Sequence, residues 1–209
     1  MKISFLGDSI TEGCGASEYG KGYVELLGKK LGIEAKNYGI GGTRIAKQKE
    51  ISEEPQWDLD FIGRVNDVDK DSDFVFVFGG TNDYGHGAAS FGKISDNDKY
   101  TFCGAVNVLT DMMIKKFGKD KLCFILPCRR FGDGIKNKHG KMLEDYVDAE
   151  RTIISGKGID FIDLYNNGFP LPKTEQGDEY TFDGLHPNDK GYEFLAEIII
   201  GYLKRKRMI

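Results

Sequence analysis

The segment of residues 74–78, Phe-Val-Phe-Val-Phe, constrains the fold most strongly because all five of its residues are apolar. A strand that is apolar at every position is covered on both faces, as at the centre of a parallel sheet between two layers of helices. Small and polar residues, Gly79-Gly80-Thr81-Asn82-Asp83, follow directly and end the strand. We therefore expect the chain to fold around this segment.

Strand and helix signals alternate along the whole chain of 209 residues. This alternation predicts one α/β domain, residues 1–209, in which five parallel strands form the middle of a three-layer α/β/α sandwich. The polar segment 50–73 is expected to wrap the surface, and residues 84–99 to form a long loop. The predicted strands are residues 3–6, 33–38, 74–78, 122–126 and 159–163, and the predicted helices are residues 23–31, 101–117, 141–155 and 188–205.

Composition and charge narrow the class of function. A formal net charge of -4 argues against a nucleic-acid-binding protein, and the basic tail 204–207 suits a solvated helix end. The sequence has no apolar tract long enough to cross a membrane. It opens directly on a strand without a secretory signal, so we expect a cytoplasmic protein. Four cysteines without a CxxC pair indicate neither a zinc site nor a disulfide framework.

Polar groups follow the predicted strands at the points where they end. Ser9 comes after the first strand, in Gly7-Asp8-Ser9, and a glycine cluster at residues 39–43 follows the second. Asn82 follows the third. Ligands of open α/β sheets bind beyond the carboxyl ends of the strands, so these groups are placed for chemistry, although Gly-Asp-Ser alone is also an ordinary turn.

Acyl transfer needs such a set of groups together with a base. His186 is the candidate base for the Ser9 hydroxyl, and Asp183, three residues earlier, can orient its imidazole. Three donors can stabilise the oxyanion: the N–H groups of Ser9 and Gly42, and the Asn82 amide. Each residue has a structural alternative, because Gly42 can close a turn, Asn82 can cap a helix, and Asp183 with His186 can form a surface turn. The combination favours acyl transfer.

Four motif blocks of the chain resemble, in order, those of the SGNH (GDSL-type) esterases and acylhydrolases. The resemblance implies a flavodoxin-like sheet with strand order 2-1-3-4-5. It further implies Ser9 as nucleophile, His186 as base oriented by Asp183, Gly42 and Asn82 as oxyanion donors, and no metal or cofactor. The blocks are Gly7-Asp8-Ser9 with Ile10-Thr11, Gly39-Ile40-Gly41-Gly42-Thr43, Gly80-Thr81-Asn82-Asp83 and Asp183-Gly184-Leu185-His186-Pro187.

We therefore predict a serine esterase that removes short acyl groups, with acetyl favoured, from a small-molecule ester such as an acetylated sugar. A lysophospholipase or thioesterase is the alternative within the family, and an inactive flavodoxin-like binding domain is the alternative outside enzymes. A phosphate-loop spacing at residues 15–21 lacks the Ser or Thr after its lysine, because Gly22 stands there. Thr11 interrupts the GxSxG pattern of the α/β-hydrolases. The oligomeric state is not predicted.

Further residues near strand ends are expected to line the substrate pocket. Arginines at its edge would favour a polar or anionic acceptor, although arginines after strands are often ordinary surface charges. These expected substrate-binding residues are Asp8, Arg44, Tyr84, His86, Arg129 and Arg130.

Overall fold

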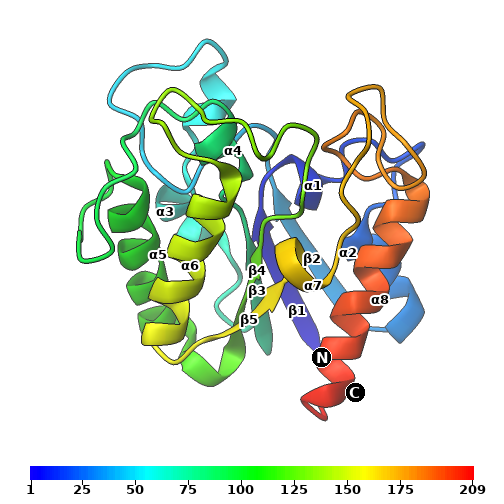
Figure 1. The fold of residues 1–209 in the computed structure, drawn as a ribbon. Helices are drawn as coiled ribbons and strands as arrows, with labels where there is room; N and C mark the ends of the chain where they lie inside the picture. The colour runs from blue at the N-terminus through cyan, green and yellow to red at the C-terminus, as the bar shows by residue number, and fades with distance from the viewer.

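A sheet of five parallel strands forms the centre of the structure, a computed structural model that describes all residues, 1–209 (Figure 1). The strand order is β2-β1-β3-β4-β5, and helices cover both faces, so the predicted fold class is confirmed. The strands are β1 (Lys2–Gly7), β2 (Glu34–Gly39), β3 (Phe74–Phe78), β4 (Leu122–Leu126) and β5 (Asp160–Asp163).

One helical layer comes from the two ends of the chain, and the other from its middle. One face of the sheet is covered by α2 (Tyr23–Leu31) and α8 (Asp189–Arg205), and the other by α5 (Phe102–Phe117) and α6 (Leu143–Gly156) (Figure 1). These four helices confirm the predicted ones to within one or two residues at each end. The helix α2 ends at Gly32, whose φ of 63° is a left-handed C-cap.

The position of β3 between the two helical layers explains why its sequence is apolar throughout. Phe74, Phe76 and Phe78 belong to the hydrophobic core on the α2 and α8 side, and Val75 and Val77 to the core on the α5 and α6 side. Successive side chains of a strand point to opposite faces, so each layer receives alternate residues. All five are buried, each worth about 1.5–3 kcal/mol relative to exposure. This strand therefore joins the two cores.

The expectation of a surface segment at residues 50–73 is wrong for its second half. After η1 (Pro55–Asp58) the chain turns inward as α3 (Phe61–Arg64) and η2 (Val65–Asp67). Phe61, Val65 and Val68 are buried in the α5 and α6 core. Their spacing of four and three residues is helical, and this apolar stripe outweighs the polar residues between them.

Short helices begin where three strands end: α1 (Ser9–Glu12) after β1, α4 (Thr81–Gly85) after β3 and α7 (Leu164–Asn167) after β5. A 3-10 turn, η3 (Lys119–Lys121), leads into β4. The predicted loop 84–99 starts inside α4, and beyond it contains only one isolated bridge, from Ser90 to Thr101. Both chain termini lie at the opposite edge of the sheet from α1 and α4 (Figure 1). None of the helices combines the length and the apolarity needed to span a membrane.

We expect two glycine-to-alanine substitutions to change stability in opposite directions. A Cβ at Gly39 would overlap the backbone of Thr11 and Glu12 in α1, so Gly39→Ala should lower the free energy of unfolding by about 1–3 kcal/mol. At Gly201 in α8 the nearest atom to such a Cβ is 3.6 Å away, in Arg205, so Gly201→Ala should raise it by about 0.5–1 kcal/mol. Urea titration of both variants measures the two changes. An unchanged stability for Gly39→Ala would contradict the tight packing of β2 on α1.

Candidate active site

Ser9 is the first residue of the one-turn helix α1, immediately beyond β1. The Asp8 carboxylate caps this helix by accepting a hydrogen bond of 3.0 Å from the N–H of Ile10. Asp8 is 1% exposed, and this burial raises the pKa of its carboxyl to about 7. Asp8 was expected in the substrate pocket, but the structure buries it beneath the turn. Its position fixes Ser9 at the end of the strand, with 7% of the serine exposed.

A hydrogen-bonded relay joins Ser9 to the loop before α8. The Ser9 Oγ lies 2.9 Å from Nε2 of His186, and Nδ1 of His186 lies 2.7 Å from Oδ2 of Asp183. The tautomer that fits this network has the proton on Nδ1, donated to Asp183, and leaves Nε2 free to accept from the serine. The fold brings Ser9 and His186 together although they are 177 positions apart in the sequence.

The Asp183 carboxylate holds both the backbone and the imidazole of this loop. Its Oδ1 accepts hydrogen bonds from the N–H groups of Leu185 (3.0 Å) and His186 (2.8 Å), while Oδ2 faces the ring. Partial burial opposes ionisation of Asp183, but the bonds from the ring and backbone of His186 outweigh it and hold its pKa below the usual value. The loop leads directly into α8, which Asn188 caps.

The ends of β2 and β3 stand on either side of Ser9, because Gly7 of β1 pairs with Gly39 and with Phe78. On the β3 side, Nδ2 of Asn82 donates a 3.0 Å hydrogen bond to the carbonyl of Thr43, which immediately follows Gly42. That bond uses one amide hydrogen of Asn82 and leaves the second for another acceptor.

Gly42 is a position that only glycine fits. Its φ is 75°, in the left-handed region, and a Cβ there would overlap the indole of Trp57. A Cβ on the preceding Gly41 would lie 3.7 Å from Cβ of Ser9. The glycine cluster therefore approaches the serine closely, as the sequence suggested.

Asp83 attaches the loop after the glycine cluster to α4. Its two carboxylate oxygens accept hydrogen bonds of 2.9 Å from the N–H groups of Ile45 and Ala46. Burial raises the pKa of Asp83 to about 6, against the lowering effect of these two bonds. This side chain supports the loop and does not face the serine relay.

Arg64 was not predicted from the sequence, although it contacts both strand ends beside Ser9. Its NH2 donates to the carbonyl of Gly7 (3.0 Å) and to Oγ1 of Thr43 (2.8 Å), and its NH1 donates to the carbonyl of Tyr38 (2.8 Å). Arg64 is only 5% exposed. The sequence did contain a signal for this role. Arg64 lies within the apolar helical stripe that starts at Phe61, and a charged residue in such a stripe needs buried partners.

Two of the expected pocket residues have structural contacts instead. The Tyr84 hydroxyl oxygen lies 2.9 Å from the Gly132 carbonyl and 2.7 Å from the Ile135 carbonyl, and its one proton is shared between these two acceptors. Tyr84 thus anchors the loop after β4. Nε of Arg129 donates to Asp133 (2.8 Å), and its guanidinium lies 4.7 Å from the Tyr165 ring centroid. Neither side chain contacts a residue of the serine relay in the structure.

Arg130 differs from its neighbour Arg129. Its NH1 lies 3.5 Å from Oγ1 of Thr81, and its guanidinium is 5.8 Å from the centroid of the Tyr84 ring. Its guanidinium therefore lies over α4, the helix that carries Asn82, while that of Arg129 points elsewhere. Arg130 stays a candidate for contact with substrate.

Arg44 and His86 meet beside Trp57. Arg44, 3% exposed, donates to Asp58 (3.0 Å) and to the carbonyl of Trp57 (3.1 Å), and its Nε is the only buried side-chain polar atom without a hydrogen-bond partner. The His86 ring lies 4.5 Å from the Trp57 ring, centroid to centroid. Burial, reinforced by Arg44 and Arg130, lowers the pKa of His86 to about 4.

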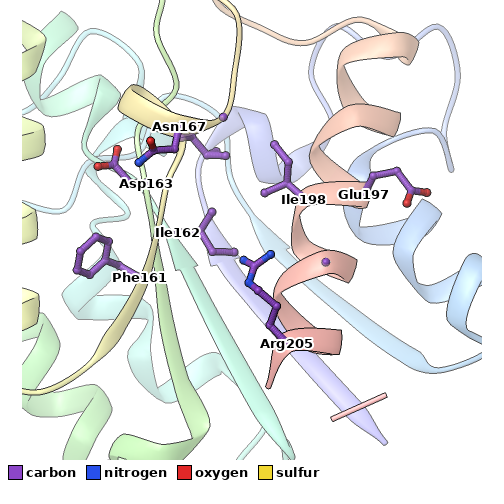
Figure 2. Close-up of a pocket in the computed structure, with 10 residues that line it drawn as sticks. Phe161, Ile162, Asp163, Asn167, Glu197, Ile198 and Arg205 are labelled. Atoms are coloured by element: carbon purple, nitrogen blue, oxygen red, sulfur yellow. The ribbon is translucent and has the colours of Figure 1, made fainter. Parts of the chain in front are cut away.

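The cavity drawn in Figure 2 is separate from these groups. It has a volume of about 440 Å³ and lies among β5, α7 and α8, with none of the serine-relay residues in its wall. A smaller pocket of about 150 Å³ includes Arg44, Trp57 and His86. No group of three or more His, Cys, Asp or Glu side chains is arranged to hold a metal ion.

The segment with phosphate-loop spacing is occupied by its own ion pairs. Nζ of Lys21 lies 2.8 Å from Asp189 and 3.3 Å from Glu18. Asp189 also accepts from the backbone and the hydroxyl of Ser17. These contacts tie the segment to the start of α8.

Comparison with known proteins gives the chain its family. It is similar to an acetylxylan esterase of Xylanibacter ruminicola, with 25% identity over 98% of this chain, but it spans only 43% of that relative's length. It also resembles the solved structures of a Lactobacillus plantarum protein (27% identity, TM-score 0.82) and of a lipase/acylhydrolase from Enterococcus faecalis (23%, TM-score 0.67), each over 98% of this chain and 96% of the other. The model of one family matches residues 5–194. The chain belongs to the GDSL-like lipase/acylhydrolase family, as its motif blocks indicated.

Proposed function

We propose that this chain is a serine esterase that hydrolyses short acyl esters, acetyl esters foremost, through an acyl-enzyme intermediate. The observation that carries the proposal is the relay Ser9–His186–Asp183, with its contacts of 2.9 and 2.7 Å. A hydrogen-bonded base is what makes a serine hydroxyl nucleophilic near neutral pH.

In the proposed reaction, Nε2 of His186 takes the proton from Ser9 as its Oγ attacks the ester carbonyl. The imidazolium that forms is stabilised by Asp183 and then gives the proton to the leaving alcohol. Water attacks the acyl-serine in the second half of the reaction, with His186 again as base, and releases the carboxylic acid.

The proposed oxyanion donors are the N–H groups of Ser9 and Gly42 and the free amide hydrogen of Asn82. The observation that supports these donors is that the glycine cluster and α4 lie close together. A hydrogen bond of 3.0 Å from Nδ2 of Asn82 to the Thr43 carbonyl joins them. Donors fixed in advance stabilise the tetrahedral intermediate without reorganising during the reaction.

An acetylated carbohydrate is the proposed substrate class. The similarity to an acetylxylan esterase supports it, over the part of that relative that the chain matches. A panel of acetylated sugars, short p-nitrophenyl esters, lysophospholipids and acyl-thioesters tests the class. A preference for the last two would replace the proposal with a lysophospholipase or thioesterase.

We expect Ser9→Ala to abolish hydrolysis of p-nitrophenyl acetate while the protein stays folded, because the hydroxyl is the nucleophile and contributes little packing. A fluorophosphonate reagent should label Ser9 in the wild type, as mapped by mass spectrometry. Turnover at the wild-type rate by folded Ser9→Ala, or label on a different serine, would show that the nucleophile is another group.

His186 and Asp183 should differ in their effect on rate. His186→Ala removes the base, whereas Asp183→Asn leaves an imidazole that accepts a proton in one of its tautomers, so the rate loss should be larger for His186→Ala. Activity should be lost as the pH falls, because a protonated imidazole cannot accept the serine proton. The lowered pKa of Asp183 keeps its carboxylate ionised as the pH falls, so Asp183 itself should not contribute to the acid limb of a kcat/KM profile. Turnover by folded His186→Ala at the wild-type rate would contradict His186 as base.

Asn82→Ala should lower kcat by about 10²–10³ with a smaller change in KM, as for a donor used mainly in the transition state. The exposed Asn66, in η2, provides the matched control, and Asn66→Ala should leave both constants unchanged. Thermal melting checks that loss of the bond to the Thr43 carbonyl has not unfolded the variant. An effect confined to KM would make Asn82 a substrate-binding group instead.

A further inference from the structure

A pocket of about 150 Å³ opens beside the proposed oxyanion hole. Its wall comes from the segment 44–53, from η1 and from the residues just beyond α4. The lining residues that matter here are Arg44, Glu50, Ser52, Glu53, Trp57 and His86.

One contact and one chain connection place the pocket near Ser9. The Trp57 indole lies against Gly42, because a Cβ on that glycine would overlap it. His86 directly follows α4, the helix that carries Asn82. Gly42 and Asn82 are the proposed oxyanion donors, so the pocket lies next to the place where the ester carbonyl would be held. One end of a bound substrate can therefore enter it.

The wall combines an aromatic face with hydrogen-bonding groups of both kinds. Trp57 is half-buried, and the His86 ring stands 4.5 Å from it at 47°. NH1 of Arg44 lies 3.5 Å from Nδ1 of His86, which suits the tautomer that accepts at Nδ1 and carries its proton on Nε2. Carboxylates of Glu50 and Glu53 supply acceptors. Sugar hydroxyls need both donors and acceptors, and the apolar face of a pyranose packs on an aromatic ring.

The charges of the wall favour a neutral occupant. The guanidinium of Arg44 is already paired with Asp58 (3.0 Å), so it is not free to neutralise an anion. Glu50 and Glu53 are both exposed and would repel one. Nε of Arg44 has no partner, and such an unpaired buried donor costs about 1–3 kcal/mol, which marks this wall as incompletely satisfied.

We infer that this pocket is the acceptor subsite and that it binds one neutral pyranose ring of the acetylated substrate against Trp57. The inference rests on the proposed esterase function and adds the place and the charge of the acceptor. It separates this pocket from Arg130, which lies over α4 and is the group that an anionic acceptor would need.

Trp57 is the only tryptophan of the chain, so tryptophan fluorescence reports on this pocket and on the adjoining Gly42. In Ser9→Ala protein, which cannot turn the ligand over, acetylated xylotriose should produce a saturable change in emission as the sugar displaces water from the indole. Acetylated galacturonic acid, an anionic sugar, should produce none at the same concentrations. No saturable change with acetylated xylotriose, or an equal response to both sugars, would overturn the inference.

Kinetics with Trp57→Phe give a second, independent test. The smaller ring should raise KM for acetylated xylotriose by roughly fivefold to tenfold, and by less for p-nitrophenyl acetate, whose leaving group has no sugar face to pack. Tyr19 is 97% exposed and outside this pocket, so Tyr19→Phe is the matched control and should change neither constant. Equal losses on both substrates, or a changed preference for acyl length alone, would place the acyl group in the pocket and overturn the inference.

These results can be told apart from failure of the proposed function. Wild-type hydrolysis of p-nitrophenyl acetate that depends on Ser9, without a sugar response at Trp57, would leave the esterase and remove the subsite. A sugar response at Trp57 without any ester hydrolysis would support the subsite and reject the esterase.

Discussion

The geometry around Ser9 depends on one buried guanidinium, that of Arg64. It donates to the last carbonyl of β1 and to Tyr38 near the end of β2, and in addition to the Leu59 carbonyl (2.9 Å) and to the hydroxyl of Thr43. Burial lowers the pKa of Arg64 to about 10, with Asp8 and Asp60 opposing, so it remains charged near neutral pH. Removing the guanidinium would take a donor from each of these buried oxygens, and a buried acceptor left unpaired costs about 1–3 kcal/mol. The Gly7 carbonyl would keep the N–H of Ile40, at 3.2 Å. Arg64 therefore fixes the serine turn and the glycine cluster relative to each other, although it forms no hydrogen bond with Ser9 or Gly42.

The order of the strands in the sheet places the other candidate groups beside Ser9. β1 lies between β2 and β3, so the residue that follows it has a glycine cluster on one side and α4 on the other. The remaining group arrives from the far end of the sequence. α8 packs against α2, on the same face as β1's large apolar residues, and the loop before it reaches over the edge of the sheet to bring His186 to within 2.9 Å of Ser9. Parallel topology thus collects groups separated by most of the chain, because every strand presents its carboxyl end at one edge.

The sequence predicted the elements better than the directions of side chains. Apolar runs such as Phe74–Phe78 and helical periodicity depend on local spacing, and the strands and four long helices followed from them. The spacing of Asp183 and His186 likewise sufficed to predict a contact within one turn, now seen at 2.7 Å. Tyr84 and Arg129 were expected in the pocket only because they follow strands, and such positions do not determine where a long side chain points. Tyr84 reaches carbonyls 48 and 51 residues further along the chain, whereas Arg129 pairs with Asp133, only four residues away. Arg64 likewise finds its buried partners far away in sequence, at Gly7 and Tyr38.

Gly42 links the proposed chemistry to the proposed specificity. Its φ of 75° is in the left-handed region, and its missing Cβ leaves the space that the Trp57 indole fills. The segment that carries Trp57 is fastened by Arg44, through Asp58 and the Trp57 carbonyl, and by Gln56, whose amide donates to the carbonyl of Gly41 at 3.2 Å. Any side chain at position 42 would therefore disturb the proposed oxyanion donor and, in addition, displace Trp57 from the wall of the proposed acceptor pocket. Changes at Glu50, Ile51 and Glu53, by contrast, alter the wall of this pocket, and none of these three residues forms a recorded hydrogen bond with the glycine cluster. Ser52 differs from them, because it bonds to Asp58 and so helps to hold the Trp57 segment. Selection for a different acceptor can act at those three residues while the relay and the oxyanion hole stay as they are.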